Sequence, residues 1–288
     1  MNPHDFAKRN PGFITRDQVV NQPDRSGRGL SSEQKSPFIS TGLQSVDDAM
    51  RGGFARECMT LIASRPRVGA TSLLIGSVLA ALNKRLKVAY YSDRLNQRQL
   101  RGRLILRASE VNGYRIQAGL MTDKEEYALD KARDDIGWDN LLMHCRKEVL
   151  LEEVLSQCVR NPPDLLIADF RPHDASGSSK AGFRSYEQGL RDIARQVAKC
   201  GSAAVVRQVL PKGNHAPDRI ELPGLGSITS IFESAVMMHR RTGESEEADV
   251  DSSRAYAQVI RVQHRDIKTR SVALHFDQRF AGLLEREV

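Results

Sequence analysis

The feature that most constrains the fold of this chain is a regular alternation of short aliphatic runs with longer amphipathic stretches, which begins at Pro37. Each short run is rich in aliphatic residues and apolar enough to be buried on both faces of a sheet. The stretches between them repeat apolar residues at helical spacing. This order predicts an α/β fold with a mostly parallel central sheet and helices on both faces. We expect strands at 58–63, 87–92, 140–144, 164–169 and 202–208, and helices at 71–83, 96–109, 122–133, 149–160 and 185–199.

The C-terminal third of the chain has a different pattern, because three apolar runs follow one another with no helical stretch between them. We expect strands near 234–239, 255–263 and 271–277, which extend the sheet as antiparallel hairpins. The acidic segment 243–253 is interpreted as a solvated connection between two of these strands.

The N-terminal segment, residues 1–36, is rich in Asn, Gln, Arg, Ser, Gly and Pro and has no apolar period. Such a segment buries too little apolar surface to offset the entropy of ordering it. We therefore interpret 1–36 as a flexible arm and 37–288 as the folded domain.

Composition excludes several classes of protein. The chain is 40% hydrophobic and 27% charged, which is ordinary for a globular protein and unlike a collagen-like or fully disordered one. No apolar run approaches the roughly 18 residues of a membrane span, and the N-terminus lacks the apolar core of a secretory signal. The four cysteines have no CxxC spacing, which argues against a zinc site and suits a reducing compartment. We expect a cytoplasmic protein, whose net charge of +7 favours an anionic partner.

The loop after the first predicted buried strand has the context of a phosphate-binding loop. Such loops read GxxxxGK[ST] between a strand and a helix, and their backbone N–H groups, Lys and hydroxyl hold phosphates and Mg²⁺. Here the loop is SRPRVGATS, so Gly69 and Thr71 fit the pattern, but Ala70 stands at the position of the Lys. Taken alone, this loop is a weak signal and is better explained as an ordinary helix start.

A wider pattern decides between these two explanations. Residues 38–71 resemble the start of the motor domain of DnaB-type replicative helicases, a group of RecA-like hexameric ring helicases, and the resemblance continues in order through YYSDRLNQRQL (90–100), DLLIADF (164–170) and segments 184–209 and 258–283. The matching residues in the first segment are Thr41, Gly42, Val46, Asp47, Gly52, Gly53, Arg65, Pro66, Gly69 and Thr71. The resemblance implies a RecA-like P-loop NTPase fold over 37–288.

The resemblance also identifies residues at which the motor of this chain is degenerate. Ala70 replaces the Lys that binds β- and γ-phosphates, and Arg94 replaces the Glu that polarises the attacking water. The neighbouring Asp93 is expected to turn to the opposite side, because side chains alternate along a strand. Val262 and His264 align with the Lys and Arg that reach the γ-phosphate of a neighbouring subunit, and only Arg261 and Arg265 flank them.

Other nucleotide-site positions keep suitable residues. Thr71 and Asp169 are expected to hold Mg²⁺, and Gln208 matches a nucleotide-sensing Gln of the family. Arg65 and Arg67 either replace part of the missing positive charge or are ordinary surface residues. The predicted nucleotide-binding set is Arg65, Arg67, Gly69, Thr71, Ser72, Asp169 and Gln208. The resemblance implies ATP or ADP with Mg²⁺ as ligand, bound weakly because the Lys is missing, and the combined losses indicate a pseudo-ATPase.

Two polar loops are candidates for binding single-stranded DNA, because in this family the loops after the corresponding strands face the central channel. They are 171–185 and 211–226, and both combine Gly, Ser or Pro with cations that suit phosphates. The family's "RESG" in the second loop is replaced by 223–226, PGLG, which weakens the match. The candidate DNA-binding residues are Arg171, Lys180, Arg184, Lys212 and Arg219.

These observations favour a non-hydrolysing protein that binds DNA or a partner helicase in replication. Two alternatives stay open: an active ATP-dependent helicase or translocase, and a RecA-like accessory factor in recombination or plasmid maintenance. The helical N-terminal domain and linker helix of the family are not expected in 1–36. We therefore expect a monomer or weak oligomer that docks on a subunit of an intact replicative helicase.

Overall fold

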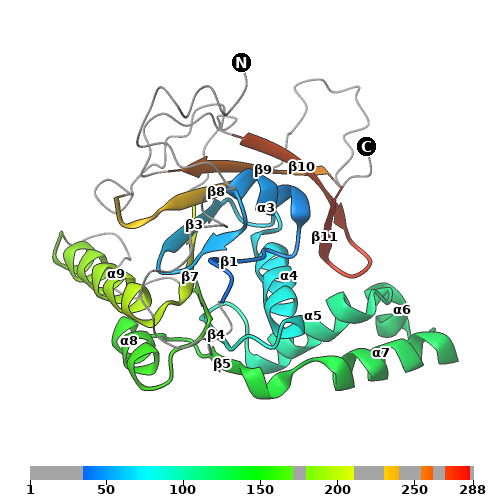
Figure 1. The fold of residues 1–288 in the computed structure, drawn as a ribbon. Coiled ribbons are helices and arrows are strands. Elements are labelled where there is room, and N and C mark those ends of the chain that lie inside the picture. Colours follow the sequence, from blue (N-terminus) through cyan, green and yellow to red (C-terminus); the bar gives the residue numbers. More distant parts are fainter. Residues whose placement is uncertain (1–34, 171–179, 211–229, 240–253, 262–269, 286–288) are drawn as a thin grey trace, which may run out of the picture. The chain divides into compact units, whose positions relative to one another are not determined.

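The centre of the sheet is built from strands that are buried along most or all of their length, whereas the outer strands are partly exposed. In the computed structural model, which describes residues 35–170, 180–210, 230–239, 254–261 and 270–285, the sheet has the strand order β11-β10-β9-β8-β3-β7-β6-β4-β5 (Figure 1). The parallel strands are β3 (Met59–Ser64), β4 (Val88–Ser92), β5 (Leu141–Cys145), β6 (Leu165–Asp169), β7 (Ala203–Val209) and β8 (Ser234–His239). The predicted α/β class with a mostly parallel sheet is confirmed, and the five predicted central strands agree with it within one or two residues.

The C-terminal strands differ from the prediction in one respect. β8 was expected to belong to an antiparallel hairpin extension, but it pairs in parallel with β3 and only its other edge pairs antiparallel with β9 (Arg254–Arg261). The physical reason is burial: residues 235–238 of β8 are at most 1% exposed, as befits a strand inside a parallel sheet. The antiparallel part therefore consists of β9, β10 (Arg270–Asp277) and β11 (Gly282–Glu285), and β11 was not predicted.

Helices cover both faces of the sheet and enclose two separate cores. On one face lie α8 (Leu151–Arg160) and α9 (Lys180–Cys200), which pack on alternate side chains of β3, β6 and β7. On the other face lie α3 (Gln44–Met50), α4 (Ala70–Asn83) and α5 (Gln97–Ser109) (Figure 1). The two faces of one buried strand thus each supply a core.

Two helices and a small sheet were missed by the sequence patterns. Helix α6 (Gly113–Ala118) is too short to show a period, and α3 precedes the first buried strand. Strands β1 (Phe38–Ile39) and β2 (Phe54–Ala55) form a two-stranded sheet. Helix α7 (Asp123–Asp135) begins within one residue of its predicted start, where Thr122 and Glu125 form a capping box. Helix α9 begins at Lys180, five residues before the predicted start, and a 3₁₀ turn, η1, spans Trp138–Asn140.

The arm predicted for residues 1–36 lies almost wholly outside the described residues, as does the acidic segment 243–253. Among the described helices, none combines the length and apolar character needed to cross a membrane.

Candidate nucleotide site

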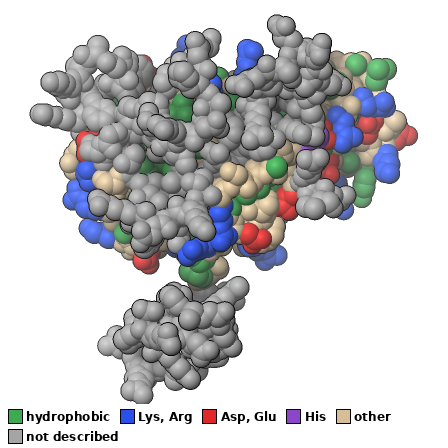
Figure 2. Space-filling view, turned by 90° about the horizontal axis from the view of Figure 1, so that it is seen from above, with side chains coloured by type: hydrophobic (Ala, Val, Ile, Leu, Met, Phe, Trp, Pro, Cys, Tyr) green, Lys and Arg blue, Asp and Glu red, His purple; other side chains and the backbone are tan. Residues whose placement is uncertain are grey.

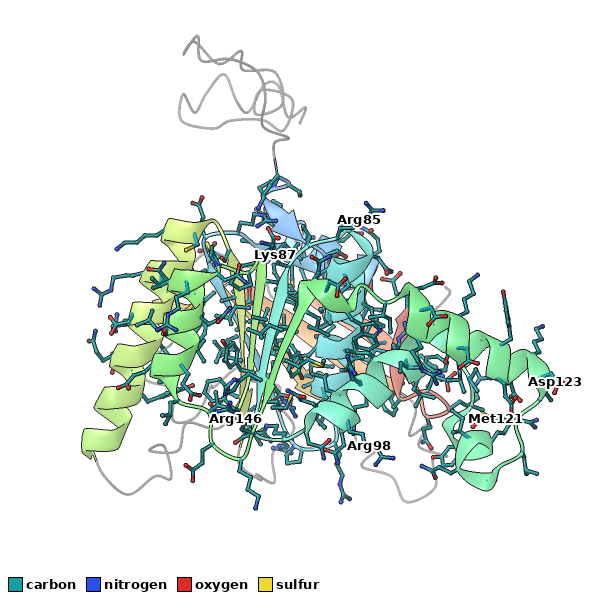
Figure 3. All side chains as sticks on the ribbon, turned by 90° about the horizontal axis from the view of Figure 1, so that it is seen from below. Arg85, Lys87, Arg98, Met121, Asp123 and Arg146 are labelled. Atoms are coloured by element: carbon teal, nitrogen blue, oxygen red, sulfur yellow. The ribbon has the colours of Figure 1, made fainter. Side chains whose placement is uncertain are left out.

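The candidate site lies where four neighbouring parallel strands end, because the carboxyl ends of β4, β6, β7 and β3 meet at one edge of the sheet. Figure 3 shows this edge, with the labelled Arg98 and Arg146 beside it, whereas Arg85 and Lys87 mark the opposite edge. The predicted phosphate-binding loop follows β3 at this edge and leads into α4.

The loop ends at Gly69 in a backbone conformation that only glycine adopts without strain. Gly69 is the N-cap of α4 and has φ of 108°, in the region that residues with a Cβ rarely adopt. Ala70, the next residue, is 1% exposed and belongs to the core between α4 and the sheet. The position that holds an ammonium group in an intact phosphate-binding loop therefore holds a buried methyl group here.

Thr71 and Asp169 are brought together by a residue that the sequence analysis did not identify. Arg207, on β7, donates from Nη1 to Thr71 Oγ1 at 2.7 Å and to Asp169 Oδ1 at 2.9 Å. Arg207 is 7% exposed and Asp169 is 0% exposed, so this ion pair is deeply buried. The prediction that Thr71 and Asp169 share one face of the sheet agrees with this geometry.

Asp169 has two further partners, both from β4 or its end. The Tyr90 hydroxyl donates to Asp169 Oδ2 at 3.0 Å, and Arg94 Nε lies 3.2 Å from Asp169 Oδ1 as an ion pair. The strand β6 lies between β4 and β7, which is why donors reach its last residue from both sides. The carboxylate of Asp169 and the two guanidinium groups that contact it have a summed charge of +1.

Burial shifts the pKa of both Asp169 and Tyr90. Burial raises the pKa of the Asp169 carboxyl above its ordinary value, although Arg207, Arg94 and the hydrogen bond from Tyr90 all act to lower it. Burial and the nearby carboxylate of Asp169 raise the pKa of the Tyr90 hydroxyl well above its ordinary value. Tyr90 therefore keeps its proton at neutral pH and remains a donor.

Asp93 does not follow the alternation that was expected of it. Its Oδ1 atom lies 3.8 Å from Arg94 Nε, so Asp93 and Arg94 are within ion-pair distance of each other. The reason is that β4 ends at Ser92, whose hydroxyl accepts hydrogen bonds from the backbone N–H groups of Arg94 and Leu95. Strand alternation does not apply to such a turn.

The other residues of the predicted nucleotide-binding set differ in how far they are buried. Arg65 is half-buried and Arg67 is exposed with a positive φ of 64°, while Ser72 is buried at the start of α4. Gln208 lies near the end of β7, where its amide is 3.5 Å from the carbonyl oxygen of Val209. Six predicted residues lie outside the described residues: Arg171, Lys212, Arg219, Val262, His264 and Arg265.

Part of the first predicted DNA-binding loop is helical. The prediction placed 171–185 in a loop, but α9 begins at Lys180, so the backbone of Lys180 and Arg184 is helical. The apolar period of the helix continues upstream through Phe183 and Tyr186, and the Gly and Ser residues at 176–179 mark the true boundary of the polar segment.

Mg²⁺ fits this arrangement poorly. The ion needs oxygen ligands at about 2.0–2.1 Å, and the two oxygens expected to supply them are already occupied by Arg207. Among the described residues, no group of three or more His, Cys, Asp or Glu side chains is placed to hold a metal ion.

Arg207 could have been found from one signal in the sequence. The segment AAVVRQV is apolar on both faces except for Arg207 and Gln208, and a charge inside a buried strand requires a partner of opposite charge. The carboxylate that the fold offers at this edge, on the neighbouring strand, is Asp169.

Comparison with known proteins agrees with the fold. A family model for the DnaB-like helicase C-terminal domain matches residues 39–284. The replicative DNA helicase DnaB of Helicobacter pylori is 27% identical over 162 residues, which are 55% of this chain and 33% of the helicase. The DnaB of Treponema pallidum is 23% identical over 252 residues, which are 84% of this chain and 55% of the helicase. The chain thus spans about a third to just over half of these relatives.

Solved structures show the same fold. One of them, an isolated ATPase domain, superposes with a TM-score of 0.72 at 18% identity, covering 88% of this chain and 94% of that domain. A DnaB-like replicative helicase, solved in a study of its interactions with primase, gives 0.71 at 17% identity, covering 94% of this chain and 66% of the helicase. The RadB recombinase gives 0.58 at 15% identity, covering 87% of this chain and all of RadB. With the family match over 39–284, these similarities show that the chain belongs to the DnaB-like helicase C-terminal domain family.

Proposed function

We propose that this chain is a non-hydrolysing member of the DnaB-like family that acts in DNA replication by binding a replicative helicase, single-stranded DNA or both. The observation that carries the proposal is the position of Arg94. It stands where the family resemblance places the carboxylate that orients the attacking water, and its guanidinium pairs with Asp169 at 3.2 Å.

A cation at this position opposes hydrolysis for an electrostatic reason. Water attacks a phosphoryl group when a carboxylate or amide accepts its proton or orients it, and a guanidinium has no lone pair for that task. The missing Lys acts in the same direction, because Ala70 supplies no charge to the β- and γ-phosphates. Loss of one such group costs an enzyme about 3 kcal/mol or more of transition-state stabilisation.

The relatives support the choice of partner class. They are named replicative DNA helicases, and one structural neighbour was solved for its interactions with primase. The predicted DNA-binding residues lie in segments outside the described residues or at the start of α9. In the face shown in Figure 2, described Lys and Arg side chains are interspersed with Asp and Glu side chains at the margins of the molecule. The proposal therefore places DNA contact on 171–185 and 211–226 and not on these margins.

Steady-state phosphate release from ATP tests the proposal. The purified chain is assayed with Mg²⁺, with and without single-stranded DNA, beside the H. pylori DnaB as a positive control. We expect turnover below about 0.1 s⁻¹, two decades under the typical enzyme value of about 10 s⁻¹. Ala70→Lys should leave turnover below this limit, because Arg94 is unchanged. Turnover above the limit that disappears in Asp169→Asn would overturn the proposal and favour an active helicase.

A further inference from the structure

We propose that Arg207 is a built-in substitute for the divalent cation of the nucleotide site, and that it excludes Mg²⁺ from Thr71 and Asp169. This inference deepens the proposed non-hydrolysing function and rests on it for the identity of the site. It concerns the metal position, whereas the proposed function concerns the water position at Arg94.

The contacts of Arg207 match those expected of a bridging cation. A single nitrogen, Nη1, donates to the hydroxyl oxygen of Thr71 and to a carboxylate oxygen of Asp169, at 2.7 and 2.9 Å. These oxygens come from the start of α4 and from the end of β6. The guanidinium therefore links the start of α4 to the end of β6, as a metal ion bonded to both oxygens would.

A divalent ion would have to compete with Arg207 for Thr71 Oγ1 and Asp169 Oδ1. Mg²⁺ bonded to both oxygens at about 2.1 Å would also stand beside a guanidinium of like charge in a buried setting. The other carboxylate oxygen of Asp169 already accepts a hydrogen bond from Tyr90 at 3.0 Å. Both oxygens of Asp169 are thus engaged by donors from the protein.

The position of Arg207 in the fold makes it a fixed occupant. It stands on β7, which lies between β3 and β6 inside the sheet, and its side chain is 7% exposed. Movement of the guanidinium away from Asp169 would separate two buried charges, and such an unpaired charge costs several kcal/mol per ion. An arginine on a surface loop would have no such constraint.

The second guanidinium strengthens the exclusion. Arg94 Nε lies 3.2 Å from the same Asp169 oxygen that Arg207 contacts. With Asp93 beside Arg94, the two carboxylates are balanced by the two guanidinium groups, so the site has no net negative charge to attract an ion. A metal ion would add two further charges, and the carboxylate of Asp93, 3.8 Å from Arg94 Nε, is already within ion-pair distance of that arginine.

Titration with Mn²⁺ tests the substitution directly. Mn²⁺ is the probe because the electron paramagnetic resonance signal of the free ion falls as it binds, and it is titrated alone and with ADP against the same solutions without protein. We expect no saturable site in the unmodified chain. Arg207→Ser releases Thr71 and Asp169, and should bind Mn²⁺ at least about tenfold more tightly than the unmodified chain. Arg207→Ser combined with Asp169→Asn should lose this gain.

A matched control variant is offered by the other end of β6. Arg56 and Asp164 form an ion pair at 3.1 Å with both side chains 11% exposed, far along the strand from the site. Arg56→Ser removes an arginine from a carboxylate in the same way and should gain no Mn²⁺ site. Circular dichroism establishes that each variant is folded, and Arg207→Gln replaces Arg207→Ser if the latter unfolds.

The outcomes decide the inference. Saturable Mn²⁺ binding by the unmodified chain that is lost in Asp169→Asn would overturn it, because Arg207 would then not exclude the ion. Failure of the folded Arg207 variant, Arg207→Ser or its replacement Arg207→Gln, to bind Mn²⁺ would also overturn it, because the arginine would not be what occupies the metal position. An unmodified chain that binds Mn²⁺ at Asp169 and still releases no phosphate from ATP would overturn this inference alone and leave the proposed function standing.

Discussion

The two ends of strand β6 carry buried Arg–Asp ion pairs of very different construction. At its amino end, Arg56 pairs with Asp164 and donates to the carbonyl oxygen of Gly201 at 2.9 Å, and Asp164 accepts from the backbone N–H of Lys87 at 3.0 Å. The backbone thus satisfies part of each charge. At its carboxyl end, the described partners of Asp169 are all side chains, of Arg207, Arg94 and Tyr90.

This difference distinguishes an ion pair with a structural role, at the amino end, from the candidate nucleotide site at the carboxyl end. A charge that is shared with backbone groups keeps part of its hydrogen bonding when one side chain is lost. A charge whose partners are side chains from β7, β4 and the turn after β4 depends on several distant segments at once. The second arrangement is costly to build, and it is found at the edge where ligands of parallel α/β sheets bind.

The largest expected effect on stability is that of Arg207→Ala. It leaves Asp169 buried at 0% exposure with only Arg94 as a directly contacting counter-charge. We expect a loss of about 3 kcal/mol in the free energy of unfolding, at the lower end for a broken buried pair because Arg94 remains. Urea denaturation followed by circular dichroism measures it. If this loss is no larger than that of Arg56→Ala, the variant at the amino end of β6, the two ends do not differ in the way proposed.

A smaller effect is expected for Arg56→Ala at the amino end. Asp164 keeps the backbone N–H of Lys87 as a donor, and both side chains of the pair are 11% exposed. We expect a loss of about 1.5–2 kcal/mol, at the lower end of the range for a hydrogen bond to a charged group. The same urea series supplies the value, and a loss above about 3 kcal/mol would show that burial alone sets the cost at both ends.

The fold was largely predictable from the sequence because its strands are buried on both faces. Continuous aliphatic runs such as LLIAD identified β6, and the helices between the strands showed their apolar periods. The direction of β8 was not predictable in this way. An apolar run indicates burial, but whether its neighbour runs parallel or antiparallel depends on the path of the intervening chain.

The site was predictable only in part, for a related reason. Gly69 and Thr71 were identified from the pattern of a phosphate-binding loop and Asp169 from the family resemblance, and the structure brings Thr71 and Asp169 within reach of one nitrogen atom of Arg207. Arg207 itself fits no motif. Its role depends on which strand lies beside β6, and Arg207 is 38 residues away from Asp169 in sequence.

A third Arg–Asp pair, in which the arginine is exposed and the aspartate is buried, gives a reference for both ends of β6, and its removal should have the smallest effect. Arg279, which is 65% exposed, donates to Asp277 at the turn after β10, and its hydrogen bond lowers the pKa of the Asp277 carboxyl. A lowered pKa in the folded state means that the pair contributes stability above the ordinary aspartate pKa of about 3.9, and that this contribution is lost as the pH falls through the lowered value. Arg279→Gln should therefore cost less stability than Arg56→Ala at pH 7, because solvent screens the exposed guanidinium of Arg279, and its cost should shrink further as the pH falls through the lowered pKa of Asp277. Carboxyl ¹³C NMR titration should show the pKa of Asp277 moving up in the variant. A cost at pH 7 that matches Arg56→Ala would mean that exposure does not separate the pair at this turn from the pair at the amino end of β6.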